Sequence, residues 1–198
     1  SIATFTAGSG TTSVGHGLTS KPDVVIQKKI NGTSEWYIYY AFVDGSLDYL
    51  IFDTDSAATW GGTAATSTVF YENWSSGTEL VAYSFHSVEG FSKIFKYTGG
   101  GSGNLPFVFC GFRPAFVMVK NTSDNTASWI IFDNKRNVHN VVDKRLDPDS
   151  SSSEGTFTTA MDFLSNGFRI RASGLSQSND VYLFMAFAEQ PFKYSNAR

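Results

Sequence analysis

The chain has few of the residues that crosslink proteins or bind metals. Its 198 residues include one cysteine, Cys110, and three scattered histidines, His16, His86 and His139. A single thiol cannot form an intrachain disulfide, and zinc ribbons and iron–sulfur clusters need several. The sequence around Cys110, FVFCGF, is strongly hydrophobic and predicts a small buried side chain rather than a catalytic thiol.

Charge and long hydrophobic runs are scarce as well. Charged residues make up 17% of the chain, and the net charge is -3, whereas a nucleic-acid binder would normally show a basic patch. The longest apolar run, residues 181–188, is far shorter than the roughly 20 residues of a membrane-spanning helix. We therefore expect neither a nucleic-acid partner nor membrane insertion. A content of 41% hydrophobic and 16% aromatic residues argues against intrinsic disorder.

The two halves of the sequence resemble each other. Residues 21–28, KPDVVIQK, align with residues 113–120, RPAFVMVK, and residues 36–39, WYIY, align with residues 129–132, WIIF. The offset between matching segments grows slowly along the chain, as insertions in loops would cause. The repeat predicts two domains, residues 1–93 and 94–198.

The local pattern is typical of β-structure. Short runs of Val, Ile, Phe, Tyr and Trp alternate with clusters of Gly, Ser, Thr, Asn and Asp. In residues 165–171 an Asn-Gly turn precedes Phe168 and Ile170, which alternate with Arg169 and Arg171. No segment combines a helical period with helix caps. We predict an all-β fold of two tandem duplicated antiparallel β-sandwich units, similar to a jelly roll.

Enzyme motifs are missing from the sequence. It has no G-x-S-x-G, P-loop or H-E-x-x-H pattern. Glu89 and Glu189 follow the last strand of each repeat and would be the pair of carboxylates that a glycoside hydrolase needs. We expect them instead to bind backbone N–H groups at their turns, and we expect no catalytic residues.

An Asp-x-Asp-Ser sequence occurs in each half, with Asp53 and Asp55 in the first and Asp147 and Asp149 in the second. Carboxylates and hydroxyls are ligands that Ca²⁺ prefers, which makes these four aspartates the candidate metal site. Calcium takes about 6–8 oxygen ligands, however, and only a few are visible here. We favour turns in which each aspartate caps its own backbone, and we expect no cofactor.

Two further sets of residues are candidates for ligand binding. Trp60 and Trp74 have no counterpart in the second half and lie in loop-like surroundings, where an exposed indole can stack on a sugar or anchor a protein. The alternative is that they cover one end of the sandwich. Lys135 and Arg136 belong to a small basic cluster suited to an acidic polysaccharide, or else are solvated and neutralised by neighbouring aspartates.

Three stretches resemble a family of uncharacterised domains in tail-fibre and other structural proteins of bacteriophages, especially marine phages. They are VEGFSK at residues 88–93 with the following YTG, GFRPAFVMVK at residues 111–120, and AFAEQPFKY at residues 186–194. The resemblance implies a virion location, on an extracellular appendage, and it supplies no catalytic residues.

Together these features predict a non-enzymatic structural or adhesin module of a tail fibre or similar appendage. Its expected partners are a host-surface glycan or protein, other virion proteins and further copies of the chain, as in a trimer, because oligomerisation increases the buried area of a small unit. The alternatives are a fragment of a carbohydrate-active enzyme (a depolymerase) and an architectural spacer without a ligand.

Overall fold

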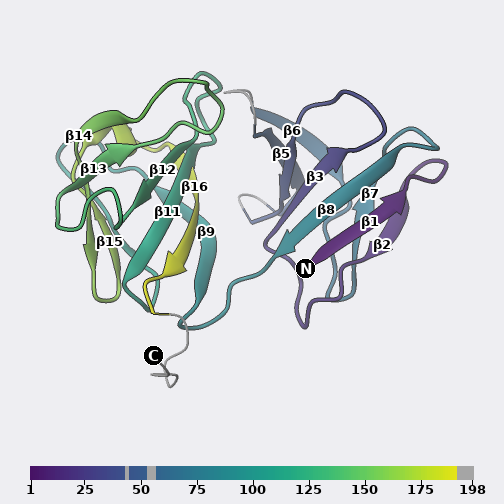
Figure 1. Ribbon diagram of the computed structural model, residues 1–198, viewed down its shortest axis with the longest axis horizontal. Helices are drawn as coiled ribbons and strands as arrows, with labels where there is room; N and C mark the ends of the chain where they lie inside the picture. The colour runs from purple at the N-terminus through teal and green to yellow at the C-terminus, as the bar shows by residue number, and fades with distance from the viewer. Residues whose placement is uncertain (43–44, 53–56, 191–198) are drawn as a thin grey trace. The chain divides into compact units, whose positions relative to one another are not determined.

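The computed structural model describes residues 1–42, 45–52 and 57–190, with only the backbone described for residues 57–61. It consists of two compact units, Ser1–His86 and Ser87–Arg198. Nearly all regular structure is β-strand, and the strands are joined by turns and longer loops (Figure 1). The strand pairings are antiparallel, which confirms the predicted all-β fold.

The first unit contains a six-stranded sheet with the order β1-β8-β3-β4-β5-β6 and a separate pair, β2-β7. The cluster of buried residues at Val25, Phe70 and Ala82 includes a side chain of β7, with Phe5 and Tyr39 packed against it. The short pair therefore covers one face of the larger sheet. The strands are β1 (Ile2–Thr6), β2 (Thr12–Gly15), β3 (Val24–Lys29), β4 (Tyr37–Tyr40), β5 (Leu47–Ile51), β6 (Ala57–Gly62), β7 (Val69–Glu72) and β8 (Glu79–Phe85).

The second unit is a sandwich of two four-stranded sheets, β12-β11-β16-β9 and β10-β15-β14-β13. A 3-10 turn, η1 (Ser173–Leu175), precedes the last strand, β16. The strands are β9 (Ser92–Thr98), β10 (Phe107–Phe109), β11 (Pro114–Asn121), β12 (Ile130–Asp133), β13 (Val142–Arg145), β14 (Gly155–Leu164), β15 (Gly167–Ile170) and β16 (Val181–Ala188).

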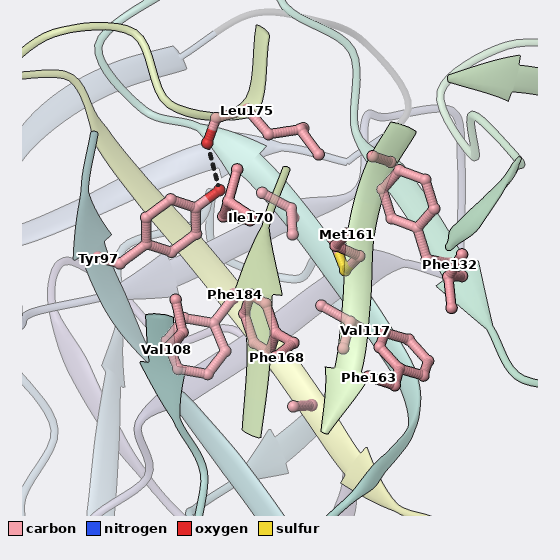
Figure 2. Close-up of a cluster of buried hydrophobic side chains, with 14 of the residues drawn as sticks. Tyr97, Val108, Val117, Phe132, Met161, Phe163, Phe168, Ile170, Leu175 and Phe184 are labelled. Atoms are coloured by element: carbon pink, nitrogen blue, oxygen red, sulfur yellow. Dashed lines mark hydrogen bonds between the residues drawn. The ribbon is translucent and has the colours of Figure 1, made fainter. Parts of the chain in front are cut away.

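The core of the second unit is aromatic and continuous between its sheets (Figure 2). Tyr97 and Tyr182 stack with their ring centroids 4.8 Å apart, and Phe168 meets Phe184 edge to face at 5.4 Å. The Tyr97 hydroxyl donates a 2.9 Å hydrogen bond to the carbonyl oxygen of Leu175, which satisfies a polar group inside the core. Burial raises the pKa of Tyr97 well above its ordinary value, so the phenol stays neutral.

The six-stranded sheet of the first unit and the sheet β12-β11-β16-β9 of the second share the order of four strands. We call these two the central sheets. The segment β1-β8-β3-β4 of the first corresponds to β9-β16-β11-β12 of the second, as the sequence alignment of the halves implies. The aligned lysines also make equivalent contacts: Lys28 donates to the carbonyl oxygen of Ser34, and Lys120 donates to that of Ala127. What differs between the units is the layer over this shared sheet, a two-stranded pair in one and a four-stranded sheet in the other.

Cys110 is 7% exposed, as the sequence predicts. Burial raises the pKa of its thiol to about 12, although the nearby Lys93 opposes the shift. Since the thiolate is the reactive form, native protein at pH 8 should react with a thiol reagent many times more slowly than protein unfolded in guanidinium. Labelling of the native protein at the rate of the unfolded protein would contradict this expectation.

Candidate functional site

An aromatic groove on the first unit is the most distinctive site of the described structure. It has a volume of about 330 Å³ and lies against strands β4 and β5 of the six-stranded sheet. Three tyrosines and a tryptophan supply most of its wall, and an amide and a hydroxyl supply polar groups. The lining residues are Tyr37, Tyr39, Tyr49, Asn73, Trp74 and Ser75.

The tyrosines share one face of the sheet because side chains alternate along a strand. Tyr37 and Tyr39 are two positions apart on β4, and Tyr39 lies directly opposite Tyr49 of β5. The ring centroids of Tyr37 and Tyr39 are 6.2 Å apart with the rings nearly parallel, while those of Tyr37 and Tyr49 are 5.4 Å apart at 66°. All three side chains are half-buried, so the groove presents aromatic surface to solvent.

Trp74 closes the groove from the segment that follows β7. Its ring meets that of Tyr37 at 85°, with 5.3 Å between the centroids, so the two rings form a corner. The indole Nε1–H donates a 2.8 Å hydrogen bond to Oε1 of the buried Gln27, and the backbone N–H donates a 2.8 Å bond to Oε2 of Glu72. Gln27 thus holds the indole, and Glu72 holds the backbone that carries it, before any ligand arrives.

Glu72 connects the groove to the rest of the unit. Its side chain is buried, and Oε1 accepts hydrogen bonds from the backbone N–H of Gly8, at 3.3 Å, and from the hydroxyl of Thr12. With the bond from Trp74, this carboxylate joins the turn between β1 and β2 to the segment after β7. A buried charge that is bonded in this way holds its neighbours in one arrangement.

The phenol of Tyr39 is kept in its neutral form. Burial is the largest cause of its raised pKa, and the neighbouring Tyr37 and Tyr49 raise it further, whereas a hydrogen bond with Trp74 lowers it. The net shift is upward, so the hydroxyl remains a hydrogen-bond donor throughout the physiological pH range.

Among the described residues of the second unit, the equivalent positions belong to the core. Tyr37 and Tyr39 align with Ile130 and Phe132, which are 8% and 0% exposed and belong to the sandwich core. The four-stranded sheet covers these positions, whereas β2 and β7 leave the tyrosines half-buried. Sequence reasoning singled out Trp74 but treated the tyrosines only as strand residues. The signal was the pair of tyrosines at alternate positions of WYIY, where the aligned WIIF has isoleucine and phenylalanine.

Other candidates from the sequence lie partly outside the described residues. Asp53 and Asp55 fall there, and so does the side chain of Trp60, whose backbone belongs to β6. The metal prediction can therefore be followed only at Asp147 and Asp149.

These two aspartates are engaged with the protein. Asp149 accepts a 3.0 Å hydrogen bond from the backbone N–H of Trp129, and Asp147 lies 3.3 Å from the guanidinium of Arg145. Burial raises the pKa of Asp149, and the adjacent Asp147 carboxylate contributes to the shift. Within the part of the chain that the structure describes, no group of three or more His, Cys, Asp or Glu side chains could hold a metal ion.

The basic cluster is also largely tied to its own loop. Asp133 accepts hydrogen bonds from the backbone N–H groups of Lys135 and Arg136 and forms a 2.6 Å ion pair with the Arg136 guanidinium. Lys135 is exposed, but Arg136 is half-buried and also donates to the carbonyl oxygen of Ile131. The pair therefore does not present two solvated cations.

Two of the stretches that carry the resemblance, residues 111–120 and 186–194, meet at Glu189 together with Asn134. Its carboxylate lies 2.8 Å from the Nε of Arg113 and accepts a 2.9 Å hydrogen bond from the amide of Asn134, so it binds side chains as well as ending a strand. We expected this carboxylate to bind backbone N–H groups at its turn. The contacts fasten the start of β11, the end of β12 and the end of β16 to one another.

Comparison with known families assigns the chain to one of them. It belongs to the family described as "Domain of unknown function (DUF7483)", which matches residues 1–191. Comparisons with curated proteins and with solved structures gave no match. The family match covers almost the whole chain and includes residues of both units. Among the described residues, no helix has the length and apolar character to cross a membrane.

The aspartate pairs give a test of metal binding. If they are turn residues, as we favour, neither a chelator nor added Ca²⁺ should change the melting temperature, because only binding to the native state stabilises it. Calorimetry of the protein in EDTA and then in excess Ca²⁺ measures this. A melting temperature that falls with EDTA and recovers with Ca²⁺ would establish the metal site instead.

Proposed function

We propose that this protein is a non-enzymatic adhesin module that binds a host-surface glycan in the aromatic groove of its first unit. The observation that carries the proposal is the groove itself, in which Tyr37, Tyr39, Tyr49 and Trp74 surround about 330 Å³. Sites for small molecules are concave and mainly aromatic or apolar, with a few polar groups that orient the ligand. The volume is at the lower end of the usual range for such sites, which suits one or two sugar residues.

The rigidity of the groove supports binding of a weakly held, water-soluble ligand. A sugar offers C–H faces for stacking and hydroxyls for hydrogen bonds, but each contact contributes little. Trp74 is already oriented by Gln27 and Glu72, so little side-chain entropy remains to be lost on binding.

The resemblance to tail-fibre domains of bacteriophages supports the setting that we propose, a surface appendage of a virion. A carbohydrate-active enzyme is the rival. Of the two carboxylates considered for that role, Glu189 is bound by Arg113 and Asn134, which disfavours it as a free general acid or nucleophile.

Replacing Trp74 with alanine should weaken glycan binding about ten-fold or more, equivalent to about 1.4 kcal/mol, because one wall of the groove is lost. Trp74→Phe should retain part of the affinity, since it keeps an aromatic face but loses the bond to Gln27. The measurement is a glycan array followed by titration calorimetry with the best ligand.

Phe95→Ala is the matched control, because Phe95 is an exposed aromatic residue of the second unit. It should bind as tightly as the wild type. Wild-type affinity in Trp74→Ala, with its fold verified by circular dichroism, would remove the groove from the proposed function.

We also propose self-association through the exposed edge of the second unit. Phe107 and Phe109 of the edge strand β10 are 43% and 64% exposed, and an apolar edge strand favours pairing with another chain. Light scattering at micromolar concentration should show a homo-oligomer, a trimer in the first instance. The Phe107→Ser, Phe109→Ser variant should scatter as a monomer, whereas a monomeric wild type would contradict the proposal.

A further inference from the structure

We propose that the aromatic groove selects uncharged hexose residues and rejects anionic sugars such as hexuronates. The inference rests on the proposed glycan-binding function and specifies the ligand class of the same site. Three independent features of the groove lead to it: the lining, the charge behind it, and the direction of the lysines of strand β3.

The described lining carries no formal charge. Its side chains are phenols, an indole, an amide and a hydroxyl, from Tyr37, Tyr39, Tyr49, Asn73, Trp74 and Ser75. A carboxylate that enters such a groove loses hydration and meets no cation to replace it, which is costly. A neutral sugar brings hydroxyls, which both donate and accept, as the phenols, the amide and the serine hydroxyl do.

A buried negative charge lies directly behind the wall. The Glu72 carboxylate is 2.8 Å from the backbone nitrogen of Trp74, and its charge contributes to the raised pKa of Tyr39. An effect on a phenol of the groove means that the same charge acts on a ligand there. In surroundings of low polarity it would repel a second carboxylate.

The lysines of the adjacent strand β3 are directed elsewhere. Lys28 lies with its ammonium 5.4 Å from the ring centroid of Trp36 and donates to the carbonyl oxygen of Ser34. The Lys29 side chain lies against Gly32, where an added Cβ would come within 2.9 Å of it. Neither ammonium lines the groove, so neither balances the charge of Glu72 for a ligand.

The test uses pairs of sugars that differ only at C6. The methyl glycosides of glucose, galactose and mannose (the hexosides) are compared with the methyl glycosides of the corresponding uronic acids (the uronides), whose C6 carboxylate is free. Binding is measured by saturation-transfer NMR and calorimetry. At least one hexoside should bind, and its uronide should bind at least ten-fold more weakly at pH 7. A uronide that binds as tightly as its hexoside, or more tightly, would overturn the selectivity while leaving glycan binding in place.

A gain-of-function variant tests directly whether electrostatics cause the difference in affinity between hexoside and uronide. Ser75 is exposed at the groove, so Ser75→Lys adds a cation there, and Ser75→Gln adds length without charge. Only Ser75→Lys should narrow the gap between hexoside and uronide, by several-fold. If the gap stays the same in Ser75→Lys, electrostatic exclusion is wrong. If no hexoside, uronide or arrayed glycan binds the wild type, the proposed function fails together with this inference.

Discussion

The layer that covers the central sheet determines what each unit can do. Both units share the strand order of this sheet, and a sheet that is apolar on one face must bury that face against another layer. In the second unit the layer is a four-stranded sheet, and the enclosed side chains form a continuous core. In the first it is the pair β2-β7, and Tyr37, Tyr39 and Tyr49 of β4 and β5, at its margin, remain half-buried.

Tyrosine is well suited to such a margin. Its ring packs against apolar neighbours, while its hydroxyl remains available to water or a ligand. Tyr39 shows both roles, since it packs against the small core of the first unit and also lines the groove. The aligned Phe132 is entirely buried and needs no hydroxyl. The same strand in the two repeats thus serves as a core element in one unit and as a binding surface in the other.

Buried polar groups fix the geometry of this margin. Gln27 and Glu72 are both almost inaccessible to solvent, and each accepts a hydrogen bond from Trp74. Buried polar groups stabilise a unique arrangement when their partners are present and are costly when they are not. The groove therefore depends on side chains that no ligand would touch, and its shape is set by the fold of the first unit.

The sequence predicts the local features of this structure well. Alternating apolar residues and turn signals identify the antiparallel strands, and the hydrophobic surroundings of Cys110 predict its burial. The groove could be predicted only in part, because Trp74 and the tyrosines come together through the pairing of β2 with β7 and the placement of that pair on the sheet. Such long-range packing leaves no local pattern.

The same reason explains why Lys135 and Arg136 do not form the pair of exposed cations that the sequence suggests. The sequence shows two adjacent cations at Lys135 and Arg136, but not the turn in which Asp133 binds the Arg136 guanidinium. Likewise the Asp147 and Asp149 carboxylates meet an arginine and a backbone N–H group supplied by folding.

The central claim is that ligand binding belongs to the partly covered sheet of the first unit. A ¹H–¹⁵N NMR titration with a neutral methyl hexoside tests it most directly. The account predicts that the indole N–H signal of Trp74 and the backbone signals of Tyr37, Tyr39 and Tyr49 shift together and saturate, while signals of the second unit stay unchanged. Shifts confined to the second unit, or the absence of any shift up to the solubility limit of every hexoside, would contradict it.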